Sequence, residues 1–302
     1  MMQPVSTRVM NLSQFLTDSA RRQPEEIGLV WGEETWAWSA LEARATAFAA
    51  ALRDRYGMRK GDRLLVQSAN CNQMFEAAFA CWKLGCVWVP ANFRQTPEEV
   101  AWLAMSSGAK GLLAGAEFAG HIAACKDVAF TVTISGAGED DYDTLVAEFA
   151  EVPVAVAEVD RDDPAWFFFT SGTTGKPKAA VLTHGQLAFV ITNHLCDLMP
   201  GTGPDDASIV VAPLSHGAGI HQLTQVAHGV KTILPGGAKF DPAEVWRMVA
   251  KWRVTNAFTV PTIVKMLVEH PSVYEYDHSS LRYMIYAGAP MYRADQIHAI
   301  EV

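Results

Sequence analysis

The 302-residue sequence has no uninterrupted apolar run of about 18 residues, the length that a membrane-spanning helix needs. Charged residues such as Glu76, Lys83 and Glu117 interrupt every candidate segment. Residues 1–22 also lack the basic segment followed by an apolar segment that is typical of a secretion signal. These absences predict a soluble, cytoplasmic protein without a transmembrane segment.

The sequence also has few cysteines and no excess of positive charge. Its 5 cysteines include no Cys-x-x-Cys pair, which predicts reduced, mostly buried thiols. The formal net charge of -9 argues against a nucleic-acid surface, because such a surface needs clustered Lys and Arg. An anionic small molecule needs only local positive charge. The closest pair of histidines, His216 and His221, lacks the spacing of a metal site, so we expect no metal ligands.

What the sequence does contain is an alternation of short apolar segments and helical segments. Residues 26–38 predict a hairpin, and residues 40–56 predict a helix capped by Ser39. From residue 61, strands expected at 63–69, 86–92 and 109–115 are separated by helices expected at 71–84 and 97–107. This alternation predicts an α/β fold with mostly parallel, doubly wound sheets.

A second run of the same alternation begins at residue 186. Since the chain is also longer than a usual single domain, we expect two doubly wound α/β subdomains packed together. Their approximate limits are residues 1–60 with 186–302, and residues 61–185. Ligands of doubly wound sheets usually bind at the carboxyl ends of the strands, so the loops at these ends are the candidate sites.

One such loop is FFFTSGTTGKPK, residues 167–178, which follows a buried aromatic strand. Gly172 and Gly175 allow close approach of the backbone to a ligand, and successive amide groups in such a turn can bind an anion. Pro177 stiffens the exit, where the charge of Lys178 suits a polyphosphate. By composition alone, a solvated turn without a ligand is an equal alternative. The loop G-x-x-x-x-G-K-[ST] does not fit, because only two residues separate the glycines.

The longer stretch TSGTTGKPKAAVLTH resembles the phosphate-binding signature of the adenylate-forming (AMP-binding) superfamily, although Ala179 stands where that family usually has glycine. Three further stretches are similar to family motifs in the same order. They are APLSHGAG at 212–219, FTVPT at 258–262 and YAGAP at 286–290. The chain is therefore identified as a member of this superfamily, of the acyl-CoA synthetase (AMP-acid ligase) type, over the N-terminal domain portion.

The resemblance implies a two-step reaction. A carboxylate attacks the α-phosphate of ATP, which gives an acyl-adenylate and pyrophosphate, and a thiol, commonly that of coenzyme A, then displaces AMP. Mg²⁺ is inferred from this chemistry. The implied phosphate-binding residues are Thr170, Ser171, Gly172, Thr173, Thr174, Gly175 and Lys178, and the implied adenine-binding residues are Ala287, Gly288, Ala289 and Pro290.

His216 resembles a family histidine that lies near the acyl carboxylate and the α-phosphate, and it is the implied catalytic residue. The acyl pocket implied by the motifs contains His216, Gly217, Gly219 and Thr259. The small glycines leave room for a fatty or aryl acid. The stretch HGAGIHQLTQ has no acidic residue that could hold an amino group, which favours a CoA ligase. We expect His221 to pack, and His184 to cap a helix or support the loop.

The sequence departs from the family pattern at its end. The Tyr-Gly-x-Thr-Glu motif, the ribose-binding aspartate and the small C-terminal domain with its catalytic lysine are missing from the 302 residues. We therefore expect an incomplete N-terminal domain, residues 1–302, with little activity alone and with self-association into homo-oligomers through an unpaired sheet edge. Two alternatives remain open. One is a non-catalytic nucleotide-binding or interaction protein, and the other is an amino- or aryl-acid adenylation domain that serves a carrier protein.

Overall fold

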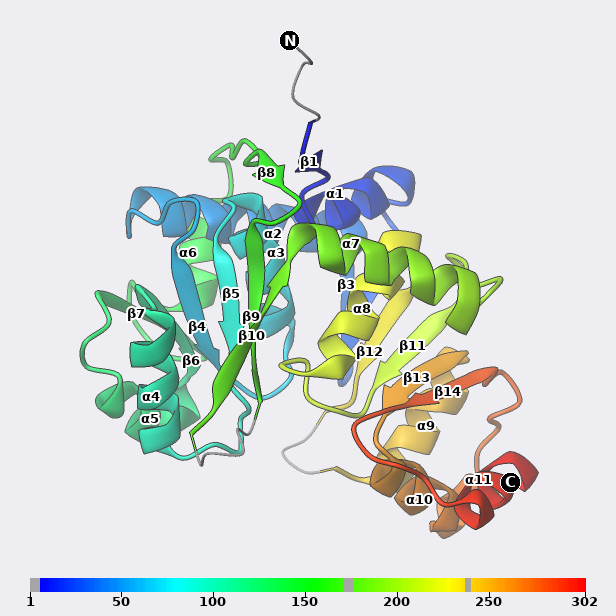
Figure 1. The fold of residues 1–302 in the computed structure, drawn as a ribbon. Coiled ribbons are helices and arrows are strands. Elements are labelled where there is room, and N and C mark those ends of the chain that lie inside the picture. Colours follow the sequence, from blue (N-terminus) through cyan, green and yellow to red (C-terminus); the bar gives the residue numbers. More distant parts are fainter. Residues whose placement is uncertain (1–5, 171–175, 237–239) are drawn as a thin grey trace. The chain divides into compact units, whose positions relative to one another are not determined.

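The computed structural model describes residues 6–170, 176–236 and 240–302, and the chain divides into two compact units (Figure 1). The first unit contains Met1–Arg21 and Ser39–Val190, and the second contains Arg22–Trp38 and Ile191–Val302. Residues 6–21 and 39–60 therefore belong with the first unit, whereas the sequence grouped them with 186–302. For residues 39–60 the physical reason is a buried polar network, described below, that ties this segment to the first unit.

The first unit is built on a sheet whose strand order is β10-β9-β5-β4-β6-β7 over the described residues. The strands are β4 (Arg63–Gln67), β5 (Val87–Pro90), β6 (Gly111–Gly115), β7 (Phe130–Ile134), β9 (Pro164–Thr170) and β10 (Lys178–Thr183). All neighbours are parallel except β10, which pairs with β9 in the antiparallel sense. The sheet is therefore mixed, and the expectation of a mostly parallel sheet holds for its other strands.

Helices surround this sheet, and their caps explain where several of them begin and end. They are α1 (Ser13–Arg22), α2 (Trp38–Asp54), α3 (Asn72–Lys83), α4 (Pro97–Ser107), α5 (Ala119–Ala124), α6 (Tyr142–Glu148) and α7 (His184–Asn193), with a 3-10 turn at Ala116–Phe118. Helix α4 begins at a capping box between Thr96 and Glu99 and ends at Gly108, whose φ is +62°. Helix α2 begins at Trp38, so Ser39 lies inside it and is not its N-cap.

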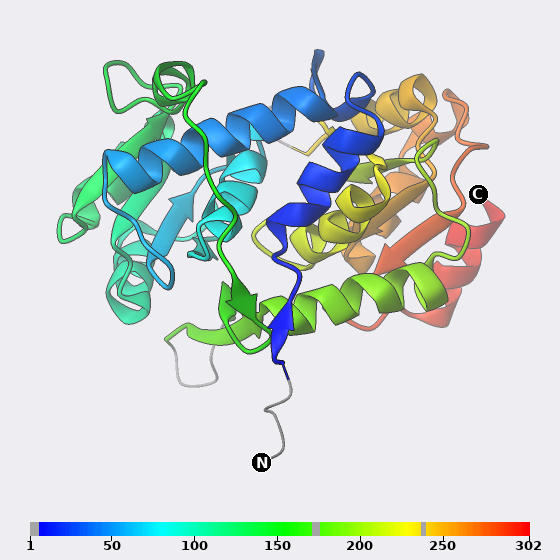
Figure 2. The ribbon, with the colours of Figure 1, turned by 90° about the horizontal axis from the view of Figure 1, so that it is seen from above.

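A short two-stranded sheet holds the start of the described chain in the first unit. Strand β1 (Arg8–Val9) pairs with β8 (Val159–Asp160) in the antiparallel sense, and Figure 2 shows the two strands side by side. Arg8 and Glu158 also form an exposed ion pair of 2.7 Å across this edge. The N-terminal segment is therefore anchored beside the connector that leads into β9.

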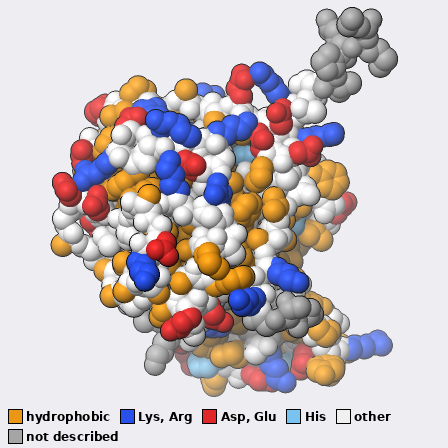
Figure 3. All heavy atoms as spheres, turned by 60° about the vertical axis from the view of Figure 1, so that its left-hand side comes forward, with side chains coloured by type: hydrophobic (Ala, Val, Ile, Leu, Met, Phe, Trp, Pro, Cys, Tyr) orange, Lys and Arg blue, Asp and Glu red, His pale blue; other side chains and the backbone are white. Residues whose placement is uncertain are grey.

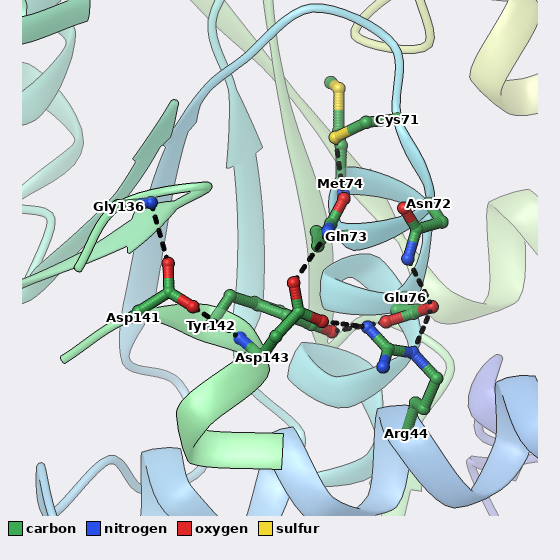
Figure 4. A network of polar contacts seen from close by, with 10 residues as sticks. All are labelled: Arg44, Cys71, Asn72, Gln73, Met74, Glu76, Gly136, Asp141, Tyr142 and Asp143. Carbon is green, nitrogen blue, oxygen red and sulfur yellow. Dashed lines mark hydrogen bonds and ion pairs between the residues drawn. The ribbon is translucent and has the colours of Figure 1, made fainter. Parts of the chain in front are cut away.

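A buried carboxylate joins helices α2, α3 and α6 (Figure 4). Glu76 is fully buried, and its Oε1 lies 2.8 Å from Nε of Arg44. Asn72 Nδ2 donates to the same oxygen at 3.0 Å, and the hydroxyl of Tyr142 donates to Oε2 at 3.0 Å. The Nη2 atom of Arg44 lies 2.6 Å from Oδ1 of Asp143. Burial lowers the pKa of Arg44, but the charges and hydrogen bonds of these carboxylates outweigh that effect and raise it, so Arg44 stays charged.

The second unit has a sheet in the order β14-β13-β11-β12-β2-β3 over the described residues. Its strands are β2 (Ile27–Trp31), β3 (Glu34–Ala37), β11 (Ala207–Val210), β12 (Lys231–Leu234), β13 (Asn256–Thr259) and β14 (Tyr283–Tyr286). Strands β2 and β3 form the hairpin expected at 26–38, and the other neighbours are parallel. Strand β14 lies at an edge of the sheet (Figure 1).

Helices cover both faces of this second sheet. They are α8 (Gly217–His228), α9 (Pro242–Trp252), α10 (Pro261–Glu269) and α11 (Arg293–Glu301), with a π-helical turn at His194–Leu198 and a 3-10 turn at Pro271–Tyr274. One face packs against α9 and α10 in an apolar core that includes Ile209, Ile233, Trp246 and Ala257. The opposite face of the strands meets α8. Asp241 caps α9 by accepting from the amide of Ala243 at 2.9 Å.

Charged side chains of both signs are mixed on the face drawn in Figure 3. Independently of that view, many charged side chains of the described residues form ion pairs. Arg55, for example, lies 3.3, 3.3 and 3.2 Å from carboxylates of Glu139, Asp140 and Glu148. Within the described residues, no helix is both long enough and apolar enough to cross a membrane. The cysteines of the described chain are all free thiols, and Cys71, Cys81, Cys86 and Cys125 are buried.

Candidate functional site

The stem of the glycine-rich loop is a β-hairpin in the first unit. Strand β9 ends at Thr170, β10 begins at Lys178, and these two residues are paired in register. Both residues are exposed. Ser171, Gly172, Thr173, Thr174 and Gly175 lie outside the described residues. The structure therefore places the two ends of the loop together at the carboxyl end of β9, and Lys178 starts a strand instead of belonging to the loop exit.

Trp102 of helix α4 contacts the segment that leads from this loop into β10. The ammonium of Lys176 lies 4.1 Å from the centroid of its ring. The indole Nε1 donates to the carbonyl oxygen of Pro177 at 3.3 Å. The sequence did not indicate Trp102 as a site residue. A single tryptophan on an expected helix does not show which distant segment of the chain its side chain will contact.

His216 lies in the second unit, directly before helix α8. It is half-buried, and its Nδ1 lies 3.0 Å from Oγ of Ser215. Burial lowers the pKa of His216 below its ordinary value, so the imidazole is neutral at pH 7 and can either accept or donate a hydrogen bond. This side chain therefore stands at the end of the loop that follows the carboxyl end of β11.

Gly217 and Gly219 follow His216 in the first turn of α8. A Cβ added at Gly217 would lie 2.7 Å from the ring of Phe258, so only glycine allows this close approach without a shift. The sequence assigned Thr259 to the acyl pocket. Successive side chains of a strand point to opposite faces of the sheet, so Thr259 of β13 lies on the same face as Ala257, which packs towards α9 and α10, and Phe258 lies on the other face. Phe258 is therefore the β13 residue that meets the start of α8.

The expected adenine-binding residues Ala287, Gly288, Ala289 and Pro290 follow strand β14 and are all exposed. The amide of Ala287 donates to the carbonyl of Thr259 at 3.2 Å, and Gly288 has φ of +84°, which favours glycine. Strands β11, β13 and β14 are parallel, so their carboxyl ends share one edge of the sheet. The structure thus brings His216, Gly217 and residues 287–290 to the same edge, while the stem of the glycine-rich loop lies in the other unit.

The sequence of this chain matches the family described as AMP-binding enzyme over residues 16–299. The chain belongs to this AMP-binding family. It is 33% identical over 289 residues to the feruloyl-CoA synthase of Amycolatopsis sp, a match that covers 94% of this chain and 55% of the relative. It is 29% identical over 262 residues to 4-coumarate–CoA ligase 2 of Oryza sativa subsp. japonica, with 80% of this chain and 46% of the relative covered. The chain therefore spans about half the length of the curated relatives that it matches.

Solved structures of related enzymes share the fold. The inhibitor-bound N-terminal domain of FACL13 from Mycobacterium tuberculosis superposes with a TM-score of 0.86 at 26% identity, covering 97% of this chain and 74% of that chain. The O-succinylbenzoate coenzyme A synthetase (MenE) of Bacillus subtilis in complex with AMP gives a TM-score of 0.81 at 27% identity, covering 95% and 70%. The fold of this AMP-binding chain is therefore that of the N-terminal domains of adenylate-forming enzymes.

His221 of this AMP-binding chain lies inside a polar cluster between helix α8 and the sheet. It is fully buried, and its Nε2 lies 2.9 Å from Oδ1 of Asn256 and 3.4 Å from Oγ of Ser208. Burial lowers the pKa of His221 to about 4, so the ring is neutral. Gln222 links Ser208 to Thr232, with distances of 3.3 and 2.8 Å. These contacts agree with the packing role that the sequence predicted for His221.

His184 occupies the first position of helix α7 and is also fully buried. Its Nδ1 accepts a hydrogen bond from the amide of Leu12 at 3.3 Å, so it joins α7 to the start of the chain in the first unit. Burial lowers the pKa of His184 to about 4, although the nearby charge of Asp163 opposes the shift. This histidine supports the region after β10 and does not contact the described ends of the glycine-rich loop.

The described residues contain no group of three or more His, Cys, Asp or Glu side chains that could hold a metal ion. The family's use of ATP implies Mg²⁺, but no described side chains form a carboxylate cluster for it.

Proposed function

We propose that this chain provides the ATP- and acid-binding domain of an AMP-forming acyl-CoA ligase, which activates a fatty or aryl acid and transfers it to coenzyme A. The observation that carries this proposal is the common sheet edge shared by His216, the first turn of α8 and residues 287–290. Carboxyl ends of parallel strands are the usual ligand-binding edge of doubly wound sheets.

Each group has a role that follows from its chemistry. Residues 287–290 present exposed backbone and small side chains, which suit a flat adenine ring. The hydroxyl and amide groups of Thr170 to Gly175, with the cation of Lys178, suit the negatively charged β- and γ-phosphates. Neutral His216 can donate a hydrogen bond to the carboxylate oxygen or to the α-phosphate as charge develops there.

The reaction proceeds by two displacements. A carboxylate oxygen of the acid attacks the α-phosphorus, the bond from this phosphorus to the bridging oxygen breaks, and pyrophosphate leaves with the electron pair. The thiol sulfur then attacks the acyl carbon and loses its proton to solvent, the bond from this carbon to the phosphate oxygen breaks, and AMP leaves with the electron pair as the thioester forms. Because neither step needs a nucleophilic side chain, positioning and charge neutralisation account for most of the catalysis.

An aryl acid is the favoured substrate within this proposal. The ring of Phe258 lies against Gly217 beside His216, so an aromatic surface borders the start of α8. A flat aromatic acid can stack on such a surface, and aromatic pairs contribute roughly 0.5–1.5 kcal/mol beyond simple burial. The names of two relatives, feruloyl-CoA synthase and 4-coumarate–CoA ligase, point to the same class.

ATP–pyrophosphate exchange tests this proposal on the 302-residue polypeptide, with an aryl acid such as 4-coumarate compared with a fatty acid. We expect exchange that depends on the acid and is faster with the aryl acid. His216→Ala should lower exchange by about 100-fold, as typical for the loss of one transition-state donor, and leave ATP affinity nearly unchanged. His298→Ala, an exposed histidine on α11, is the matched control.

Two results would change the assignment. ATP binding without any acid-dependent exchange would favour a non-catalytic nucleotide-binding role for these residues. Preference for a pantetheinyl carrier protein over free coenzyme A as the thiol acceptor would favour an adenylation domain that loads a carrier. One relative has a name of this class, the fatty acid–[acyl-carrier-protein] ligase ScoC of Streptomyces coeruleorubidus, which is 27% identical over 294 residues.

A further inference from the structure

Trp102 makes two different contacts with two consecutive residues of the same segment. Its ring faces the ammonium of Lys176 at 4.1 Å, and its indole nitrogen donates to the carbonyl of Pro177 at 3.3 Å. The first contact is a cation–π interaction, and the second fixes the direction of the peptide that enters β10. Such a pair of contacts constrains both the side chain and the backbone of this segment.

The ring of Trp102 is itself held in place. Trp102 packs against the apolar core of the first unit, which includes Leu65, Val89 and Leu112 from three adjacent strands. Helix α4, which carries it, is bounded by the Thr96 capping box and by Gly108. A side chain that is fixed on one side by the core and on the other by its helix can act as a rigid support for a neighbouring loop stem.

The supported segment needs such a contact. Pro177 has no amide hydrogen and cannot donate to the ladder between β9 and β10. The first pair of that ladder is Lys178 with Thr170, and both of these residues are exposed. The indole hydrogen bond to Pro177 lies directly before this first pair, so it orients the backbone at the point where Lys178 enters the strand.

We propose that Trp102 is a positioning residue for polyphosphate binding, which holds the Lys176–Lys178 stem so that the charge of Lys178 faces the β- and γ-phosphates of ATP. This inference rests on the function proposed above. Trp102 does not touch the substrate and acts through the stem. Because AMP lacks the β- and γ-phosphates, the contribution of Trp102 should appear with ATP and not with AMP.

Nucleotide titrations of two variants test this inference. Trp102→Ala removes both contacts and should weaken ATP binding about 10-fold, the equivalent of about 1.4 kcal/mol for a cation–π contact and one hydrogen bond together. Trp102→Phe keeps an aromatic ring but loses the indole donor, and it should weaken ATP binding by about threefold. The affinity for AMP should stay within twofold of the wild-type value in both variants.

Two control variants match the perturbation. Met105→Ala truncates an exposed residue of the same helix, α4. Trp252→Phe alters a tryptophan in the second unit whose ring also faces lysines, at 5.4 Å for Lys231 and 5.3 Å for Lys251. Neither change should alter the affinity for ATP or for AMP. Unchanged ATP affinity in Trp102→Ala, or an equal loss of ATP and AMP affinity, would overturn the inference.

Hydrogen exchange separates a failure of this inference from a failure of the proposed function. In the absence of nucleotide, the amides of β10 should exchange faster in both Trp102 variants than in wild type and in Met105→Ala. Unchanged exchange in β10 would overturn the positioning role whatever the nucleotide results. Faster exchange in β10, combined with a wild-type chain that binds no ATP, would support the role of Trp102 in the stem and count against the proposed function.

Discussion

Replacing Glu76 by Gln tests the polar network that joins helices α2, α3 and α6 (Figure 4). The substitution keeps the size of the side chain and removes its charge. One amide oxygen can still accept from Nε of Arg44 or from Asn72, and the hydroxyl of Tyr142 can turn to accept from the new NH2 group. The variant therefore isolates the effect of the negative charge on a guanidinium that stays in place.

The magnitude follows from the burial of the pair. The Glu76 side chain is 0% exposed and that of Arg44 is 22% exposed. Removal of one partner from a buried pair costs about 3–5 kcal/mol, because the other charge is left uncompensated. Arg44 keeps its 2.6 Å contact with Asp143, so we expect the loss of unfolding free energy to lie at or below the lower limit of that range, at about 2–3 kcal/mol.

Glu158→Gln provides the matched control in the same unit. Its partner Arg8 lies 2.7 Å away, but the two side chains are 73% and 65% exposed, and exposed pairs contribute about 0–1 kcal/mol. Urea unfolding gives the two differences in unfolding free energy. Hydrogen exchange at α6 shows whether the loss lies in the first unit, which contains the network. Equal losses in Glu76→Gln and Glu158→Gln would refute the reasoning.

Three further predictions concern the site, the pH dependence and the sheet edge. Gly217→Ala should lower acid-dependent pyrophosphate exchange, and it should lower the unfolding free energy by about 1–3 kcal/mol, because its Cβ would meet Phe258. Gly203→Ala is the control, since a Cβ there has no neighbour within 4 Å, and it should change neither quantity. Burial lowers the pKa of His184 to about 4, so between pH 6.5 and pH 4 the unfolded chain binds more protons than the folded chain. Neutral His184 should therefore contribute up to about 3 kcal/mol to the unfolding free energy above pH 6.5, and this contribution should decline as the pH falls to 4. Urea unfolding at a series of pH values should show this dependence in wild type and not in His184→Asn. We also expect this chain to self-associate through edge strand β14 and through exposed apolar side chains of helix α11. Ile300→Glu, at a residue of α11 that is 84% exposed, should shift sedimentation velocity profiles towards the monomer. A wild-type chain that stays monomeric at high concentration would contradict this expectation.

The elements that the sequence predicted well are those whose signals are local. Thr96 and Gly108 delimit α4 because a capping side chain and a left-handed glycine act within one turn of the helix. Asp241 marks the start of α9 for the same reason. The hairpin of β2 and β3 was also predictable, because its turn and both strands lie within twelve adjacent residues.

The elements that the sequence missed depend on distant partners. Strand β10 shows no alternation of buried and exposed residues, since its first four residues are all exposed, and only its pairing with β9 makes it a strand. The unit to which α2 belongs is set by contacts with residues distant in sequence, such as those of Arg44 with Glu76, 32 positions away, and of Phe48 with Tyr142. No pattern within one segment contains these contacts.

The assignment of Thr259 to the acyl pocket shows where motif reasoning stops. A family motif identifies a strand and its position at the sheet edge, but a strand has two faces, and a shift of one residue exchanges them. In β13 the face is decided by Asn256, whose amide joins the cluster under α8, and by Phe258, whose ring fits against the bare backbone of Gly217. Thr259 must then point to the opposite face. The space beside Gly217 is therefore bordered by the ring of Phe258, and the place of Thr259 in the acyl pocket stays a prediction.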